Sequence, residues 1–244
     1  MPWLTVLGVP ALAYVTSIVA LMFGMSGSKQ SPSLLIGSAL ITSSIYIFHR
    51  SDACENQHMQ KRHELASAHR RLLLLLSILL FISSLVPFAM HNPLVALISF
   101  CSFAGIIAYG RGVMMKPLRS IPFIKPCMVG FSIALFGWVL NSFDNSYAVL
   151  FAFMLLCTAD ALVCDLIDIS YDRATGCSTL ACSLGGKGVW LCSLFAYICA
   201  GLFLQSITGW LFVALFVLPF LNRDLTRFFV DLRPTLVLLI VCLL

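Results

Sequence analysis

The stretch that shapes this chain runs from Asp165 to Leu180 and reads DLIDISYDRATGCSTL, directly after a long apolar segment. On a helix of about 3.6 residues per turn, Asp165, Asp168 and Asp172 fall within a narrow arc of one face. Three like charges side by side repel one another, and they persist cheaply only where water or a cation screens them. Because hard divalent cations prefer oxygen ligands, usually completed by substrate phosphates, the pattern favours a Mg²⁺ and phosphate site.

The residues around these carboxylates also distinguish them from ordinary surface acids. Surface acids on helices are commonly followed by Lys or Arg four positions later. None of the three aspartates has such a partner, and the gaps hold Leu166, Ile167 and Ile169. This pattern indicates carboxylates that face a protein cavity at the edge of a membrane, where ionisable groups are costly and usually functional.

Composition places the stretch in a membrane protein. Of the 244 residues, 60% are hydrophobic and only 10% are charged, whereas soluble domains carry about 25% charged residues. The apolar residues gather in runs of roughly 20, the length that spans a bilayer as a helix. We therefore predict a single all-α, polytopic domain over residues 1–244, with about nine transmembrane helices in one bundle. The predicted spans are 3–25, 32–48, 72–90, 93–110, 126–142, 146–164, 187–205, 208–222 and 233–244.

Basic residues predict the orientation of this bundle. All of the 15 Lys and Arg residues except Lys29 lie in or beside 49–71, 111–125, 165–187 and 223–233. These are alternate connections between spans, so the positive-inside rule places them and the N-terminus in the cytoplasm. We expect an integral membrane protein whose site faces the cytoplasm. The net charge of +5 suits an anionic leaflet or substrate and indicates no nucleic-acid partner.

Two further groups of charged residues lie on the same predicted side. Asp52 and Glu55 follow the second span and are placed to face the first cluster across a cavity. Lys116, Arg119 and Lys125 follow the fourth span, and a diphosphate needs such donors in addition to metal. For both groups the alternative is an ordinary charged loop, and for the basic group the positive-inside bias alone explains the residues.

Other polar residues indicate less. Asp160 lies deeper in its span and on a different helical face, so we expect it to be neutral or hydrogen-bonded inside the bundle. The five histidines show no metal-ligand spacing, and no CxxC pair occurs among the ten cysteines. Gly185 and the three residues after it lack the pattern of a phosphate-binding loop and predict a turn.

The acidic stretch resembles the second motif of the UbiA superfamily of intramembrane prenyltransferases. That motif reads D-x-x-D-x-x-x-D, followed by a basic residue and then Gly, Thr and Leu. The matching residues here are Asp165, Asp168, Asp172, Arg173, Gly176, Thr179 and Leu180. The family usually continues with Pro, where this chain has Ala181. Tyr109 and the run from Lys116 to Lys125 resemble the tyrosine and basic loop after the family's fourth helix.

The resemblance implies an enzyme that transfers an isoprenyl group from a prenyl diphosphate to a small acceptor. It implies catalytic roles for Asp165, Asp168 and Asp172, and Mg²⁺ bound by these three with Asp52 and Glu55. The diphosphate ligands implied are Arg50, Tyr109, Lys116, Arg119, Lys125 and Arg173. We expect an aromatic quinone precursor such as a hydroxybenzoate or naphthoate as acceptor; a chlorin, a haem and a phospho-sugar are alternatives. Tyr46, Phe48, Phe131 and Trp138 are candidates to shield the allylic cation.

The first acidic motif departs from the family pattern N-x-x-x-D-x-x-x-D. With Asp52 at the central position, Phe48 and Asn56 occupy the flanking positions. This departure keeps open a non-catalytic relative that binds isoprenoids. A membrane transporter is a further alternative, because acids at membrane depth and a possible internal duplication also suit that class.

Overall fold

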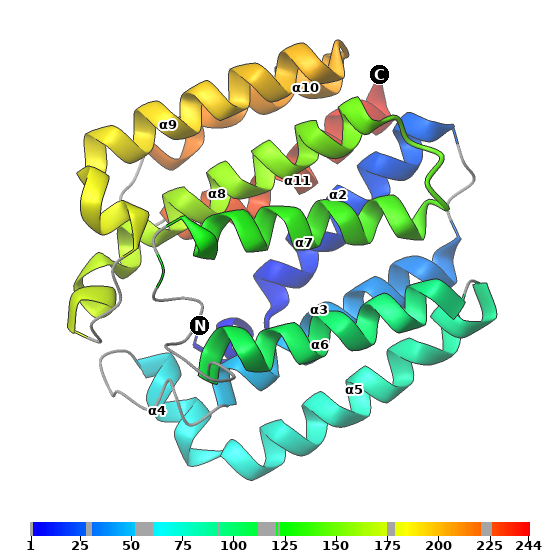
Figure 1. The fold of residues 1–244 in the computed structure, drawn as a ribbon, viewed down its shortest axis with the longest axis vertical. Coiled ribbons are helices and arrows are strands. Elements are labelled where there is room, and N and C mark those ends of the chain that lie inside the picture. Colours follow the sequence, from blue (N-terminus) through cyan, green and yellow to red (C-terminus); the bar gives the residue numbers. More distant parts are fainter. Residues whose placement is uncertain are drawn as a thin grey trace.

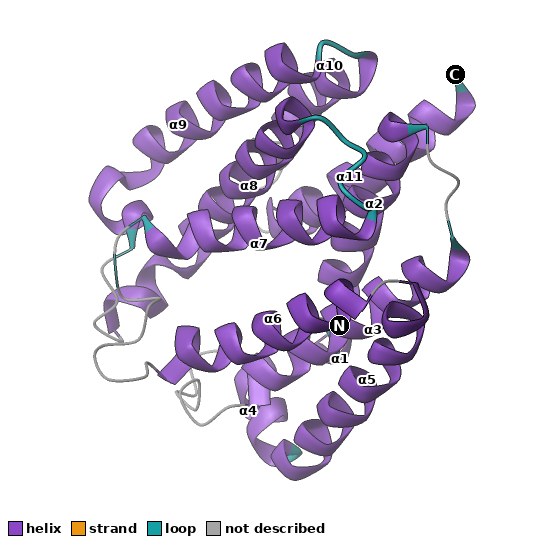
Figure 2. Cartoon of the chain, turned by 45° about the vertical axis from the view of Figure 1, so that its right-hand side comes forward, coloured by secondary structure: helices purple, strands orange, loops and turns teal. Residues whose placement is uncertain are grey.

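The computed structural model describes residues 2–27, 31–51, 61–91, 93–111, 121, 123–174, 179–220 and 226–244. Within these ranges every regular element is helical and no strand is present (Figure 2). The helices are α1 (Pro2–Val6), α2 (Val9–Ser26), α3 (Pro32–Ser51), α4 (Lys61–Ala68), α5 (Arg70–His91), α6 (Pro93–Arg111), α7 (Ile124–Leu140), α8 (Tyr147–Ala174), α9 (Leu180–Leu204), α10 (Ile207–Ala214), the 3-10 helix η3 (Leu215–Phe220) and α11 (Thr226–Leu243). The all-α prediction is confirmed.

Several of these helices have the length and composition of membrane spans. Five helices, α2, α3, α5, α8 and α9, contain segments long and apolar enough to cross a bilayer, and shorter apolar helices cover 93–107, 124–140 and 207–219. The outer face of α5 exposes Leu72, Leu75, Leu79, Ile82 and Val86, a contiguous apolar surface that lipid would cover. The count of nine spans and the cytoplasmic N-terminus stay predictions.

Glycine conformation explains two differences from the predicted spans. The first span, predicted as 3–25, is divided between α1 and α2 at Gly8, whose φ is 72°. The Cβ atom of Tyr46 would lie 2.8 Å from a Cβ at Gly8, so this position needs glycine for both its backbone and its space. The turn predicted near Gly185 is a kink within α9, where φ is 66° and ψ is 177°.

Among the helices that extend beyond the predicted limits of their spans, α8 and α11 do so with charged residues. Helix α8 continues ten residues past 164 and ends at Ala174, because the chain has no Gly or Pro before Gly176 to interrupt it. Helix α11 begins at Thr226, seven residues before the predicted span at 233. Both extensions carry charged residues, so they add polar helical surface where apolar runs had marked only the membrane segments.

Helix α8 is central to the arrangement and positions the acidic residues. It packs between α7 and α9 and also contacts α11, while α3 packs on α5 and on α2 (Figure 1). Gly130 of α7 permits a close approach to α8: a Cβ there would lie 2.0 Å from the Thr158 hydroxyl oxygen and 2.6 Å from the Met154 carbonyl oxygen. The main core includes Phe153, fully buried on the α8 side.

Candidate active site

The three aspartates of α8 lie along one wall of a cavity, as their spacing predicts. Asp165 and Asp172 are buried, and Asp168 is half-buried. The Lys125 ammonium at the start of α7 lies 2.8 Å from Asp165 Oδ1 and 3.2 Å from Asp172 Oδ2. One cation therefore already lies between two of the carboxylates, which lowers the repulsion that their spacing creates.

A second cation reaches the same wall from α11. Arg227 Nη1 lies 3.7 Å from Asp168 Oδ2. Asp231, one helical turn further along α11, lines the cavity with Arg227. From the sequence, Arg227 was expected only as one of the basic residues of 223–233, and Asp231 had no predicted role. An acid and a base at i and i+4 just before an apolar run was the signal that both share one helical face.

The carboxylates have the chemistry of a divalent-cation site. Burial raises the pKa of Asp172 above its usual range, and the ammonium of Lys125 lowers it. Asp165 Oδ2 is buried and accepts no hydrogen bond from the described groups, although buried polar atoms are normally paired. Among the residues that the structure describes, no three His, Cys, Asp or Glu side chains are placed to hold a metal together. The Lys125 ammonium lies between Asp165 and Asp172, so a divalent cation at this place would have to displace it and take further ligands from outside this set.

The cavity combines this charged mouth with an apolar interior. Its volume is about 590 Å³, and its walls come from α2, α3, α6, α7, α8 and α11. Ile41, Ile98 and Phe136 are among the apolar residues that line it away from the aspartates. A cavity with acids and bases at one end and hydrocarbon walls beyond suits an amphipathic ligand with an anionic head and an apolar tail.

Two of the four predicted cation-shielding aromatics line this cavity. They are Tyr46 of α3 and Phe131 of α7. Phe48 packs instead on Phe103 of α6 with ring centroids 4.9 Å apart. Trp138 lies near the far end of α7, where its indole nitrogen donates to the Asn145 carbonyl oxygen at 2.8 Å. Tyr46 and Phe131 therefore remain candidates for that role.

A buried polar network lies deeper on the same helix. Asp160 Oδ2 accepts a hydrogen bond of 2.7 Å from the Tyr14 hydroxyl of α2. Asp160 Oδ1 accepts a bond from the Tyr197 hydroxyl of α9 and one of 2.6 Å from Arg233 Nη1 of α11. The guanidinium carbon of Arg233 lies 4.8 Å from the Tyr197 ring centroid. The expectation that Asp160 is hydrogen-bonded inside the bundle is confirmed.

The remaining predicted site residues divide by position. Arg50 is buried and lines the cavity, and its guanidinium carbon lies 5.9 Å from the Tyr46 ring centroid. Arg173 is exposed at the end of α8 and is not part of the described cavity lining. Asp52, Glu55, Lys116 and Arg119 lie outside the described residues, as does the side chain of Tyr109 on α6.

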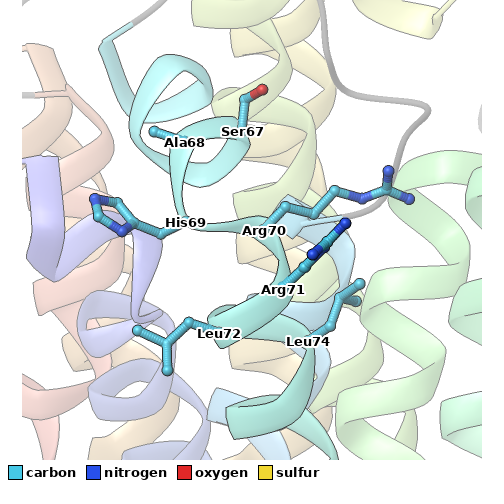
Figure 3. A pocket seen from close by; sticks show the side chains of 7 residues that line it. All are labelled: Ser67, Ala68, His69, Arg70, Arg71, Leu72 and Leu74. Atoms are coloured by element: carbon cyan, nitrogen blue, oxygen red, sulfur yellow. The ribbon is translucent and has the colours of Figure 1, made fainter.

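A second, smaller cavity of about 490 Å³ lies where α4 meets α5, lined by residues 67–72 and by Leu74. Figure 3 shows the guanidinium groups of Arg70 and Arg71 extending to the same side of the chain, with His69 on the other. Arg70 Nε donates to the Ser51 carbonyl oxygen at 3.1 Å. Arg70 thus connects α5 to the end of α3, just before the segment that holds Asp52.

Comparison with solved structures identifies the fold. A UbiA homolog from Archaeoglobus fulgidus bound to GPP and Mg²⁺ superposes with a TM-score of 0.69 at 13% sequence identity, covering 98% of this chain and 97% of that one. The same homolog bound to DMAPP and Mg²⁺ gives 0.68 at 13% identity over 98% and 96%. The apo structure of a UbiA homolog from Aeropyrum pernix K1 gives 0.67 at 15% identity over 96% and 98%.

The sequence comparisons add no relative to these structures. No protein-family model matches the chain, and no curated protein matches it. The likeness therefore establishes a UbiA-like fold over nearly the whole chain.

Proposed function

We propose that this chain is a divergent UbiA-superfamily enzyme that transfers an isoprenyl group from a prenyl diphosphate to a small acceptor. The observation that carries the proposal is one cavity lined both by Asp165, Asp168 and Asp172 and by hydrocarbon walls. Fold neighbours bound to GPP and DMAPP with Mg²⁺ support the same assignment.

In this proposal the aspartates of α8 would hold Mg²⁺, and a bound Mg²⁺ would supply positive charge to the leaving diphosphate. Lys125 exchanges its contacts with Asp165 and Asp172 for contacts with the diphosphate oxygens. Arg227 of α11 exchanges its contact with Asp168 in the same way. Lys and Arg are suited to this exchange because charge-assisted hydrogen bonds to phosphate are among the stronger ones in proteins. The contribution of Asp52 and Glu55 to the metal site remains part of the proposal.

The reaction breaks the allylic C–O bond, and the bonding electrons leave with the diphosphate. A carbon or oxygen atom of the acceptor then bonds to the allylic carbon and loses a proton. The basic side chains stabilise the charge that develops on the diphosphate, which is a major source of rate enhancement. Tyr46 and Phe131 line the cavity, where an aromatic face stabilises the allylic cation.

The proposed acceptor is a small aromatic molecule of quinone biosynthesis. A cavity of about 590 Å³ holds an isoprenyl chain and a compact ring together. The apolar outer surfaces support an integral membrane protein. We place it in a bacterial inner membrane with the mouth of the cavity toward the cytoplasm, following the distribution of basic residues.

The test is prenyl transfer by purified protein in detergent, with radiolabelled geranyl diphosphate, a panel of aromatic acceptors, and Mg²⁺ or EDTA. Asp168→Ala is the site variant. Asp144→Ala is its control, because Asp144 is an exposed carboxylate in the loop before α8. We expect Mg²⁺-dependent product that is lost in the first variant and kept in the second. Mg²⁺-dependent binding without product from any acceptor indicates a non-catalytic relative, and the absence of binding contradicts the proposal.

A further inference from the structure

The apolar cavity has one polar wall that no step of the proposed reaction uses. Tyr14 of α2 and Asp160 of α8 both line the cavity, and both are buried, at 6% and 2% exposed. Asp160 precedes Asp165 by five residues, so it lies roughly 7 Å deeper along α8. Buried polar groups beside hydrocarbon are costly unless they are hydrogen-bonded, and these have partners.

The hydrogen bonds within this wall leave lone pairs that can still accept a hydrogen bond. Asp160 accepts from Tyr14, Tyr197 and Arg233, while a carboxylate offers about four lone-pair sites. The Tyr14 hydroxyl spends its single proton on Asp160, and its oxygen keeps lone pairs. Tyr14 and Asp160 themselves therefore offer the cavity acceptors and no proton, and the Cys157 thiol beside Tyr14 is only a weak donor.

We infer that Tyr14 and Asp160 form the subsite that binds a hydroxyl group of the acceptor, and that the acceptor is neutral there. This inference rests on the proposed function. A phenolic or alcoholic hydroxyl can donate one hydrogen bond to an oxygen of this wall. It supplies the donor that Tyr14 and Asp160 lack. A carboxylate brings no donor and meets the buried charge of Asp160, so the subsite selects against it. The isoprenyl tail packs on the hydrocarbon walls of α3, α6 and α7.

The position of the network matches a role in orienting the acceptor. Arg233 is fully buried and neutralises Asp160 from behind, away from the described cavity lining. Arg233 thus balances the charge of this carboxylate from the side away from the cavity. A ring whose hydroxyl binds at this depth extends toward the aspartates at the mouth, where the allylic carbon of a bound diphosphate lies.

The test uses three naphthalene probes and two matched variants. The probes are 1-naphthol, 1-methoxynaphthalene and 1-naphthoate, which share one ring and present a donor, no donor and a carboxylate. The variants are Tyr14→Phe and Tyr197→Phe. Each removes one hydroxyl that donates to Asp160, but only Tyr14 lines the cavity. Dissociation constants are measured by equilibrium dialysis of the full chain in detergent without Mg²⁺.

We expect wild-type protein to bind 1-naphthol roughly fivefold more tightly than 1-methoxynaphthalene, the difference that one neutral hydrogen bond produces. Tyr14→Phe changes that preference more than twofold, because it removes one accepting oxygen and frees Asp160 Oδ2 beside it, whereas Tyr197→Phe keeps the preference within twofold. Equal binding of naphthol and its methyl ether, tighter binding of 1-naphthoate, or equal losses in both variants would each overturn the inference. Mg²⁺-dependent binding of geranyl diphosphate, measured separately on wild type, shows whether the proposed function fails independently.

Discussion

The ion pair between Arg233 and Asp160 carries the sharpest stability prediction. Arg233 Nη1 lies 2.6 Å from Asp160 Oδ1, and the two side chains are 0% and 3% exposed. Replacing Arg233 with Met leaves the Asp160 charge buried with only the hydroxyls of Tyr14 and Tyr197 as donors. Removing one partner of a buried pair costs about 3–5 kcal/mol, mostly because the other charge stays uncompensated.

For a chain of this length, that loss corresponds to a decrease in Tm of roughly 6–20 °C. Asp160→Asn leaves the guanidinium buried, so a similar loss is expected, offset in part by the rings of Tyr197 and Phe216 at 4.8 and 5.7 Å from its carbon. The double variant Asp160→Asn with Arg233→Met buries no charge, and its amide still pairs with both tyrosine hydroxyls.

The assay is reversible unfolding in mixed micelles of dodecyl maltoside and increasing dodecyl sulfate, followed by circular dichroism. The double variant is expected to be more stable than the sum of the single losses predicts, with a coupling free energy of roughly 2 kcal/mol or more. Additive losses, within about 0.5 kcal/mol, would show that the two charges do not depend on each other and refute the reasoning.

Three other predictions follow from contacts of single residues. Gly130→Ala is expected to destabilise the bundle by about 1–3 kcal/mol, because its Cβ would lie 2.0 Å from the Thr158 hydroxyl oxygen. Gly24→Ala is the control, because a Cβ at Gly24 would have no atom within 4 Å. Equal unfolding midpoints of the two variants would contradict the close approach of α7 to α8. Gly8→Ala is expected to lower thermal stability, since φ is 72°, and an unchanged Tm would count against the break between α1 and α2. Arg227→Met is expected to weaken Mg²⁺-dependent geranyl diphosphate binding roughly tenfold, measured by filter binding, and unchanged affinity would exclude a diphosphate contact.

Much of the architecture was predictable because it depends on local patterns. Apolar runs of membrane length, separated by polar segments, predicted helices that the structure contains, with ends that shift by up to ten residues. The spacing of Asp165, Asp168 and Asp172 predicted one face of a helix, and all three line one cavity. Helical periodicity is a property of neighbouring residues, so the order of the chain is enough to reveal it.

The limits of α8 and α11 were harder to predict from hydropathy. Both helices extend past their apolar runs, to Ala174 and back to Thr226. Hydropathy marks where the chain is apolar, while hydrogen bonding and helix-terminating residues decide where a helix ends. Arg227 lies in the extension of α11, so a residue of the candidate site was grouped with the basic loop charges, while Asp172 in the extension of α8 was found from the spacing of the aspartates.

The sequence by itself thus determined the all-helical membrane architecture, the acidic helix face and the likeness of its motif to the UbiA superfamily. Only the tertiary structure decided that Lys125 lies between two of the aspartates, that Arg227 reaches the third, and that Asp160 has its partners on α2, α9 and α11. Tyr14 and Asp160 are 146 positions apart. Contacts over such separations depend on how whole helices pack, and no periodicity along the chain encodes which side chains that packing brings together.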